Sequence, residues 1–134
     1  MILKKRKRRR KSRYKRGTHE SAKLTNGPAK YRSGWELAYM KWLDEDNDVI
    51  SYEYEPFFIE YTSNIKTGKK RKYYPDVLVK RTSSIELIEI KPKNKLTKPT
   101  VLKKINAASQ WAPANGMKLI VITEVELKQL GVIK

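Results

Sequence analysis

The 134-residue sequence contains no cysteine and only one histidine, His19. Without cysteine, neither disulfide bonds nor thiolate zinc sites can form. The single histidine lies in a polar leader, which argues against a Ser-His-Asp triad and excludes an HExxH zinc site. The longest apolar run, "LIVI", is far too short to cross a membrane, and no apolar segment follows the basic N-terminus as a secretory signal requires. We therefore expect a soluble intracellular protein.

Acidic residues are scarce relative to basic ones, with 14 Asp and Glu against 31 Lys and Arg and a formal net charge of +17. Residues 1–16 hold 11 of the basic residues and no acid, which leaves 20 basic and 14 acidic residues elsewhere. Such a block repels itself, so we expect it to be disordered when free. A solubilising tail, a nuclear-localisation-like run and an anionic-membrane patch are alternatives. Nucleic acid is favoured as the partner, because the rest of the chain is also basic.

The distribution of Gly, Pro and periodic apolar residues predicts one domain. We expect a disordered basic N-terminal arm over residues 1–30 and a folded domain over 31–134. Within that domain the patterns predict, in order, a helix at 33–46, two short strands in 47–61, strands at 73–79 and 85–91, a helix from just after Pro99 towards Gly116, a strand at 117–123 and a helix at 124–130. This order predicts an α/β fold with a mixed central sheet flanked by helices.

Two carboxylates stand in strand-like runs where apolar residues would pack more easily. Asp76 opens the run 73–79, and Glu89 lies near the end of the run 85–91 with Lys91 on the same face. A buried carboxylate is costly unless it is paired or binds a cation. If the two strands pair antiparallel, the start of one lies beside the end of the other. We therefore expect Asp76 and Glu89 to converge at one edge of the sheet.

Two convergent carboxylates form an oxygen-rich site of the kind that binds magnesium. A metal there can polarise a phosphoryl oxygen and orient a water. Lys91 is placed to lower the pKa of that water or to neutralise charge in the transition state. The simpler interpretation is an ordinary ion pair at a solvated strand end, since an Asp followed later by ExK often arises by chance.

Glu36 is a further candidate with two interpretations. It shares a helix face with Met40 and Leu43, so it is predicted to face inward. The sequence from Ser33 to Glu36 also reads S-x-x-E, which is a capping box in which the glutamate reaches back to the helix start. One glutamate can serve both purposes. Glu55 is a weaker candidate for the same site.

Two basic loops, residues 62–72 and 91–100, bracket the strands that carry Asp76 and Glu89. Loops at that edge are placed to grip a phosphate backbone on either side of a scissile bond. The predicted DNA-binding residues are Lys69, Lys70, Arg71, Lys72, Lys93, Lys95, Lys103 and Lys104.

"YPD" followed by "IEIK" resembles the PD-(D/E)xK nuclease signature, with Asp76, Glu89 and Lys91 at the motif positions. The helix bearing "WE" resembles the TnsA-type branch, in which a helical glutamate, here Glu36, joins the site. A closer resemblance is to the head-completion nucleases of T-even-type tailed phages, through "YRSGWE", "WLDEDN", "TGKKRKYYPD", "IEIKPK", "AASQWAPANGMKLIVITE" and "LKQLG". These segments follow the family's order over about residues 31–131.

The resemblance implies a restriction-endonuclease-like core and Mg²⁺- or Mn²⁺-dependent cleavage of DNA. Asp76, Glu89 and the Ile90 carbonyl would bind the metal, Glu36 would join directly or through water, and Lys91 would position the attacking water. It further implies action in the host cytoplasm during phage assembly or in the virion. Head-vertex or portal proteins would be partners, and no membrane or small-molecule cofactor is expected.

Two alternatives remain from the sequence. A non-catalytic protein would coat or plug DNA at the head vertex through its basic residues. A nuclease of the same fold would instead act on branched DNA as a resolvase, or on transposon ends. Nicking of plasmid DNA would distinguish a nuclease from the non-catalytic protein. A comparison of linear, nicked and four-way DNA as substrates would distinguish the two kinds of nuclease.

Overall fold

The computed structural model describes residues 15–134, so predictions for residues 1–14 lie outside the described residues. The helices and strands in chain order are β1 (Gly17–His19), β2 (Ala29–Tyr31), α1 (Gly34–Glu45), β3 (Val49–Tyr54), β4 (Ile59–Asn64), β5 (Lys69–Tyr73), β6 (Val77–Arg81), β7 (Ile85–Ile90), the 3₁₀ turn η1 (Lys93–Lys95), α2 (Pro99–Ala114), β8 (Lys118–Ile122) and α3 (Glu124–Gln129). Within this part of the chain, none of the helices has the length and apolar character that a membrane span requires.

The central sheet has the strand order β3-β6-β7-β8. The β3–β6 and β6–β7 pairs are antiparallel, whereas β7 and β8 are parallel. A parallel pair cannot be closed by a tight turn, and α2 supplies the crossover between these two strands. The predicted mixed α/β fold is confirmed.

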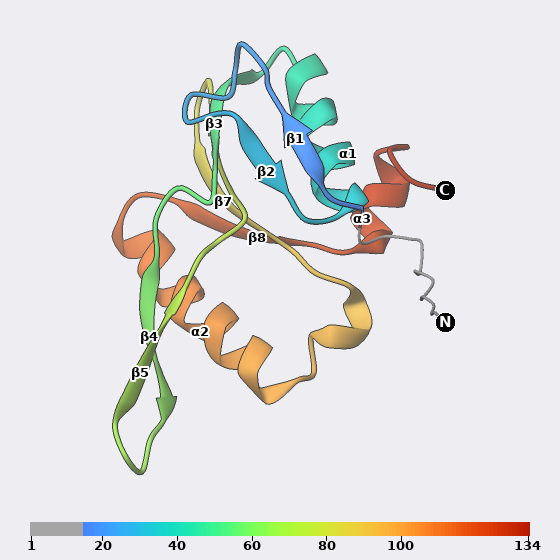
Figure 1. The fold of residues 1–134 in the computed structure, drawn as a ribbon. Helices are drawn as coiled ribbons and strands as arrows, with labels where there is room; N and C mark the ends of the chain where they lie inside the picture. The colour runs from blue at the N-terminus through green and yellow to red at the C-terminus, as the bar shows by residue number, and fades with distance from the viewer. Residues whose placement is uncertain (1–14) are drawn as a thin grey trace, which may run out of the picture.

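Helices cover both faces of the central sheet (Figure 1). On one face, Tyr39, Met40 and Leu43 of α1 and Leu127 of α3 pack against β3, β6, β7 and β8. On the other face, Ala108 and Ala112 of α2 pack against Leu78 of β6, Leu87 of β7 and the β4–β5 hairpin. Because β7 is covered on both sides, its residues alternate between two apolar cores, as the sequence pattern predicts.

Local capping explains where the helices begin. The Ser33 side chain accepts a hydrogen bond from Glu36 N at 3.2 Å and so starts α1. Pro99 occupies the first turn of α2, where its missing N–H costs nothing. Thr123 and Glu126 form a reciprocal capping box at the start of α3.

The predicted boundary of the arm at residue 30 is wrong for the part that the structure describes. Strands β1 and β2 form an antiparallel pair, and Leu24 and Ala29 are buried in the core beneath α1 and β3. The side chain of Asn26 ties this segment to β3, because it accepts a hydrogen bond from Tyr54 N at 2.9 Å and donates one to Tyr54 O at 2.8 Å. The Gly, Pro and polar composition concealed a folded segment whose few apolar residues are inserted into the core.

The basic stretch 62–72, predicted to be a loop, is largely strand. Residues up to Asn64 continue β4, and Lys69 to Tyr73 form β5, with a turn at Gly68, where φ is +73°. This hairpin projects from the body of the protein beside α2 (Figure 1). Ile59 and Tyr61 face α2, whereas Glu60 and Thr62, which alternate with them, are exposed. The period-two pattern of a strand was therefore present in the sequence.

Candidate active site

Asp76 and Glu89 converge at the edge where β6 begins and β7 ends. The last aligned pair of the ladder is Val77 with Ile88, and Asp76 and Glu89 flank this pair on the two strands. The charge of Glu89 raises the pKa of Asp76, which shows that the two carboxyl groups lie close together. Both carboxyl groups are buried. The hairpin between the two strands therefore brings together the pair that the sequence pattern predicts.

Asp76 is held by the neighbouring strand through both its backbone and its side chain. Its N–H donates to Ile88 O at 3.0 Å, and its Oδ2 accepts from Ile90 N at 2.6 Å. A carboxylate oxygen thus continues the ladder in place of a peptide carbonyl. No hydrogen bond reaches Asp76 Oδ1 from any residue between 15 and 134, which leaves this buried oxygen available to another ligand.

Glu89 lies between a tyrosine and two lysines. The hydroxyl of Tyr73, at the end of β5, donates to Glu89 Oε1. Lys91 Nζ lies 3.6 Å from Glu89 Oε2, and Lys104 of α2 also acts on this carboxylate electrostatically. Both Glu89 and Lys91 come from the same extended segment, so the E-x-K spacing alone fixes their proximity.

Burial and mutual repulsion make the two carboxyl groups reluctant to ionise. Burial, followed by the charge of Glu89, holds the pKa of Asp76 well above its usual range against the opposing hydrogen bond from Ile90 N. Burial also raises the pKa of Glu89, while Tyr73 and Lys91 oppose that shift. A cation bound between them would remove this repulsion, so the site is electrostatically suited to one.

Glu36 reaches the same region from α1, on the other side of the sheet. Its Oε1 accepts from Arg32 N at 2.8 Å and from the Tyr54 hydroxyl at 2.8 Å. Its charge contributes to the raised pKa of Asp76. Only half of the predicted capping box is present, because Glu36 reaches back to Arg32 N rather than to Ser33 N. Glu36 thus has two roles in the structure. Its backbone N–H donates to the capping Ser33, and its buried carboxylate lies close enough to Asp76 to affect the pKa of that group.

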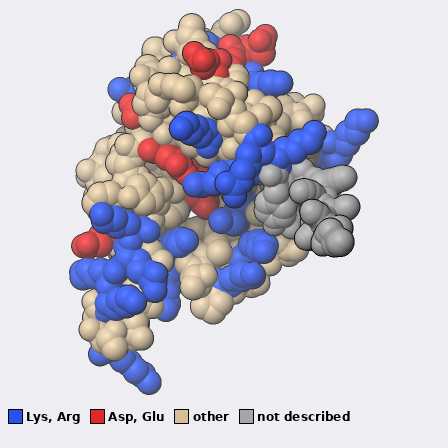
Figure 2. Space-filling model, viewed as in Figure 1, with Lys and Arg blue, Asp and Glu red and all other residues tan. Residues whose placement is uncertain are grey.

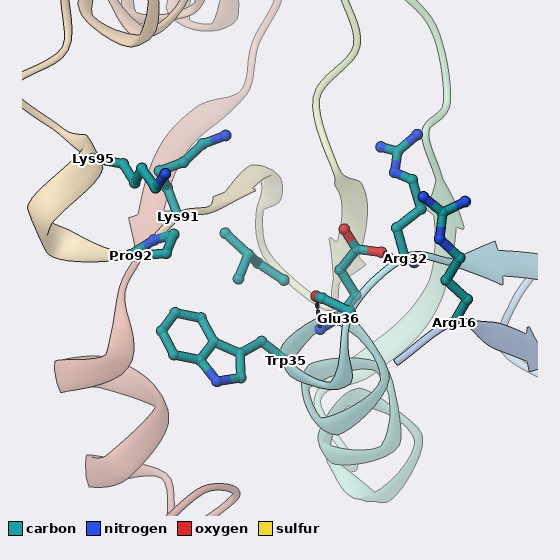
Figure 3. Close-up of a pocket in the computed structure, with 9 residues that line it drawn as sticks. Arg16, Arg32, Trp35, Glu36, Lys91, Pro92 and Lys95 are labelled. Atoms are coloured by element: carbon teal, nitrogen blue, oxygen red, sulfur yellow. Dashed lines mark hydrogen bonds between the residues drawn. The ribbon is translucent and has the colours of Figure 1, made fainter. Parts of the chain in front are cut away.

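A pocket of about 490 Å³ opens beside Glu36. Arg16 and Arg32 lie on one side of it, and Lys91 and Lys95 lie on the other, with Trp35 at its base and Glu36 between the two basic groups (Figure 3). Ile90, the residue that follows Glu89, also lines it. The pocket combines four cations with an aromatic ring, a combination suited to a phosphate-bearing ligand.

The predicted DNA-binding residues fall into three groups. Those at positions 69–72 are exposed along β5, and Lys93 and Lys95 lie on the turn that follows β7. The face seen in Figure 2 has a band of acidic side chains in its middle, flanked by Lys and Arg on both sides. Lys104 lies close enough to Glu89 to influence its charge, whereas Lys103 Nζ donates to Ser63 O at 2.7 Å and ties α2 to β4.

The two buried carboxylates of Asp76 and Glu89 are suited to a hard divalent cation. Within residues 15–134, no three His, Asp or Glu side chains are grouped so as to hold one ion. Asp76 and Glu89 supply two buried carboxylates, one with an oxygen that receives no hydrogen bond from these residues, and such oxygens are the ligands Mg²⁺ prefers. Glu36, engaged with Arg32 and Tyr54, stands in a supporting position.

Sequence reasoning missed the side chains that orient these acids. Tyr73 and Tyr54 each donate to a site glutamate, and Arg32 places its backbone N–H on Glu36 and its guanidinium on Glu55. The alternation of Tyr and Glu in "SYEYE" signals that the tyrosines face inward. Nothing in the sequence indicates which carboxylate each hydroxyl reaches, because those contacts join distant segments.

Two comparisons with known proteins show what the chain is similar to. Residues 46–124, more than half of the chain, match the family described as "TnsA-like endonuclease N terminal". The chain is also 35% identical to the head completion nuclease of Enterobacteria phage T4, in an alignment of 124 residues that covers 75% of this chain and 82% of the phage protein. Both similarities span the segment that carries Asp76, Glu89 and Lys91. The chain therefore belongs to the TnsA-like endonuclease family.

Proposed function

We propose that the chain is a metal-dependent DNA endonuclease that acts in phage head completion before the head joins the tail. The observation that carries the proposal is the buried Asp76–Glu89 pair beside Lys91, on a face flanked by cations. The family is one of endonucleases, and the phage T4 relative is a head completion nuclease. In such a role the protein would act in the host cytoplasm or the virion, with vertex or portal proteins as its neighbours.

Asp76 and Glu89 would hold Mg²⁺ or Mn²⁺, with the Ile90 carbonyl as a further ligand. When bound, the metal supplies positive charge that polarises a phosphoryl oxygen and stabilises the transition state. The hydrogen bond from Ile90 N to Asp76 Oδ2 fixes one carboxylate, and Tyr73 fixes the other. These two hydrogen bonds hold the carboxylates in place before the metal binds.

Lys91 has the role of positioning the attacking water and neutralising charge on the phosphate. Its ammonium lies 3.6 Å from Glu89 Oε2 and lines the basic pocket, so it faces both the acids and the proposed substrate. Glu36 would contribute directly or through an intervening water, and the two hydrogen bonds that its Oε1 accepts hold this carboxylate in place. The water attacks phosphorus, and the 3′ oxygen leaves.

Nicking of supercoiled plasmid DNA tests the proposal. The wild-type chain is expected to nick it with Mg²⁺ or Mn²⁺ and not in EDTA. Asp76→Ala should abolish nicking, while its affinity for DNA measured in EDTA survives. Glu53→Ala removes a carboxylate from the adjacent strand β3 and should leave nicking intact.

Two results would count against this function. Nicking by Asp76→Ala at the wild-type rate would refute the site assignment. Binding without nicking in every metal tried would instead support a non-catalytic DNA-binding protein. Faster cleavage of four-way junctions than of linear duplex would keep the chemistry and change the substrate to branched DNA.

A further inference from the structure

Two aromatic side chains stand exposed together at the base of the β4–β5 hairpin. Phe58 is 46% exposed and Tyr74 is 49% exposed. Their ring centroids lie 5.9 Å apart with the planes tilted by 59°. The last aligned pair at this end of the hairpin is Ile59 with Tyr73, so Phe58 and Tyr74 occupy facing positions one step beyond it.

The hairpin separates these rings from its apolar core by simple alternation. Ile59 and Tyr73 pack towards α2, and Phe57 lies against Trp111 on that same side. Phe58 and Tyr74 take the opposite parity and face solvent. Single exposed apolar residues are ordinary, whereas these two rings in contact form a patch that presents adjacent aromatic faces to solvent.

A cation completes the patch. Lys72 Nζ lies 4.6 Å from the centroid of the Phe58 ring. Lys70 precedes it by two residues on the same exposed strand, so positive charge continues along β5 from the rings. Aromatic faces beside a line of cations are the arrangement by which proteins hold unpaired nucleotides, with bases on the rings and phosphates on the cations.

The patch adjoins the proposed catalytic pair. Tyr74 precedes Asp76 by two residues, a span of at most about 7 Å along the backbone. The strand on the other side is tied to the same point, because Glu55 N donates to Asp76 O at 2.8 Å and Phe58 follows three residues later. A nucleotide next to a phosphate held at Asp76 is therefore within reach of the rings.

We propose that Phe58, Tyr74 and Lys72 form a stacking platform for an unpaired base of the DNA strand that enters the active site. This inference rests on the proposed function in taking DNA as the ligand and the Asp76–Glu89 pair as the active site. It adds a substrate preference, because a platform for unpaired bases favours single-stranded, frayed or flapped DNA over intact duplex. Duplex DNA keeps its bases stacked on one another and offers the rings little.

Binding measured in EDTA tests the platform separately from catalysis. The probes are a ten-nucleotide oligothymidylate, an abasic strand with the same number of phosphates, and a short duplex. The full-length double variant Phe58→Ala/Tyr74→Ala should bind oligothymidylate about five- to hundredfold more weakly than the wild type, which corresponds to one stacked base. Its affinity for the abasic strand and for the duplex should change by less than about twofold.

Matched variants separate stacking from other effects. Ile65→Ala removes a more exposed apolar side chain from the tip of the same hairpin and should leave oligothymidylate binding unchanged. Phe58→Tyr and Tyr74→Phe keep both rings and should bind as the wild type does. If the double alanine variant fails to fold, the single variants Phe58→Leu and Tyr74→Leu decide the matter, because each removes one aromatic ring and keeps an apolar side chain. Each should bind oligothymidylate more weakly than the wild type, and wild-type binding by both would overturn the platform.

Three outcomes would overturn the platform. The first is equal affinity of the wild type for the oligothymidylate and abasic strands. The second is unchanged oligothymidylate binding by the double variant, which would make the rings a protein-docking surface. The third is an equal loss on duplex and single strands. Duplex binding and plasmid nicking by that same variant would show the proposed function standing while the platform fails, whereas a wild type that binds no DNA probe would remove both.

Discussion

Asp76 and Glu89 flank the last aligned pair of the β6–β7 ladder closely enough for the charge of Glu89 to raise the pKa of Asp76, and Asp76 Oδ2 accepts a hydrogen bond from the backbone of Ile90. This relationship places two like charges in a buried position, which an ordinary protein core avoids. The Tyr73 hydroxyl, the Ile90 N–H and the Lys91 ammonium partly offset this unfavourable energy. Such an arrangement is unfavourable for stability and favourable for binding a cation.

Asp76→Asn should stabilise the metal-free protein at pH 7 by about 1–2 kcal/mol, the usual gain when a strained functional group is relieved. The raised pKa means that the folded state binds the proton more tightly than the unfolded state, so this carboxyl reduces stability as pH rises from about 4. The gap between variant and wild type should therefore widen with rising pH and close in acid. Chemical denaturation across pH measures it.

Glu60→Gln is the control for this prediction, since it removes an exposed acid from β4. It should be neutral or slightly destabilising, because the chain carries excess positive charge. A wild type as stable as Asp76→Asn at every pH would show that Asp76 carries no electrostatic strain.

Divalent cations should raise the melting temperature of the wild-type protein, because an ion that binds only the folded state stabilises it by mass action. At a concentration one hundred times the dissociation constant, the gain is about 2.7 kcal/mol. The effect should shrink in acid, where protons compete for the carboxylates. Asp76→Ala and Glu89→Gln should each remove most of it, and Glu53→Ala should not. A shift that persists in both site variants would place the ion elsewhere.

Tyr73→Phe should move the acidic limb of the pH–rate profile for cleavage to higher pH. The Tyr73 hydroxyl lowers the pKa of Glu89, so its loss raises that pKa and delays ionisation of the carboxylate. The maximal rate should also fall by about tenfold as Glu89 loses its orientation. Tyr61→Phe changes another buried tyrosine of the same hairpin and should leave the profile in place. Identical profiles for the wild type and Tyr73→Phe would show that the contact is structural.

Removal of residues 2–14 should flatten the salt dependence of duplex binding. Each phosphate contact that is lost reduces the slope of log K against log salt by up to about 0.9. A matched control replaces the nine Lys and Arg of this segment by Ser and Gly at constant length, and should give the same slope as the deletion. An unchanged slope would assign the segment to a partner other than DNA.

The sequence predicted the acid pair because its chemistry is local. Antiparallel pairing through a short turn and strand alternation were enough to bring Asp76, Glu89 and Lys91 together. The same reasoning failed for Leu24 and Ala29, whose polar neighbours hid their insertion into the core. It also failed for β5, where a run of four basic residues masked a strand supported by its partner β4. Long-range contacts such as Tyr54 with Glu36 have no periodic signal.

The division of the site between segments has a consequence for how such a protein can diversify. Asp76, Glu89 and Lys91 all come from one short hairpin and its immediate flanks, whereas the pocket and the exposed rings come from α1, the segment after β7 and the β4–β5 hairpin. Substitutions at exposed positions of those outer segments, other than Tyr73 and Glu36, can alter which polymer is bound without disturbing the acids. Descendants of one ancestor could thus acquire new targets while inheriting an unchanged means of hydrolysis.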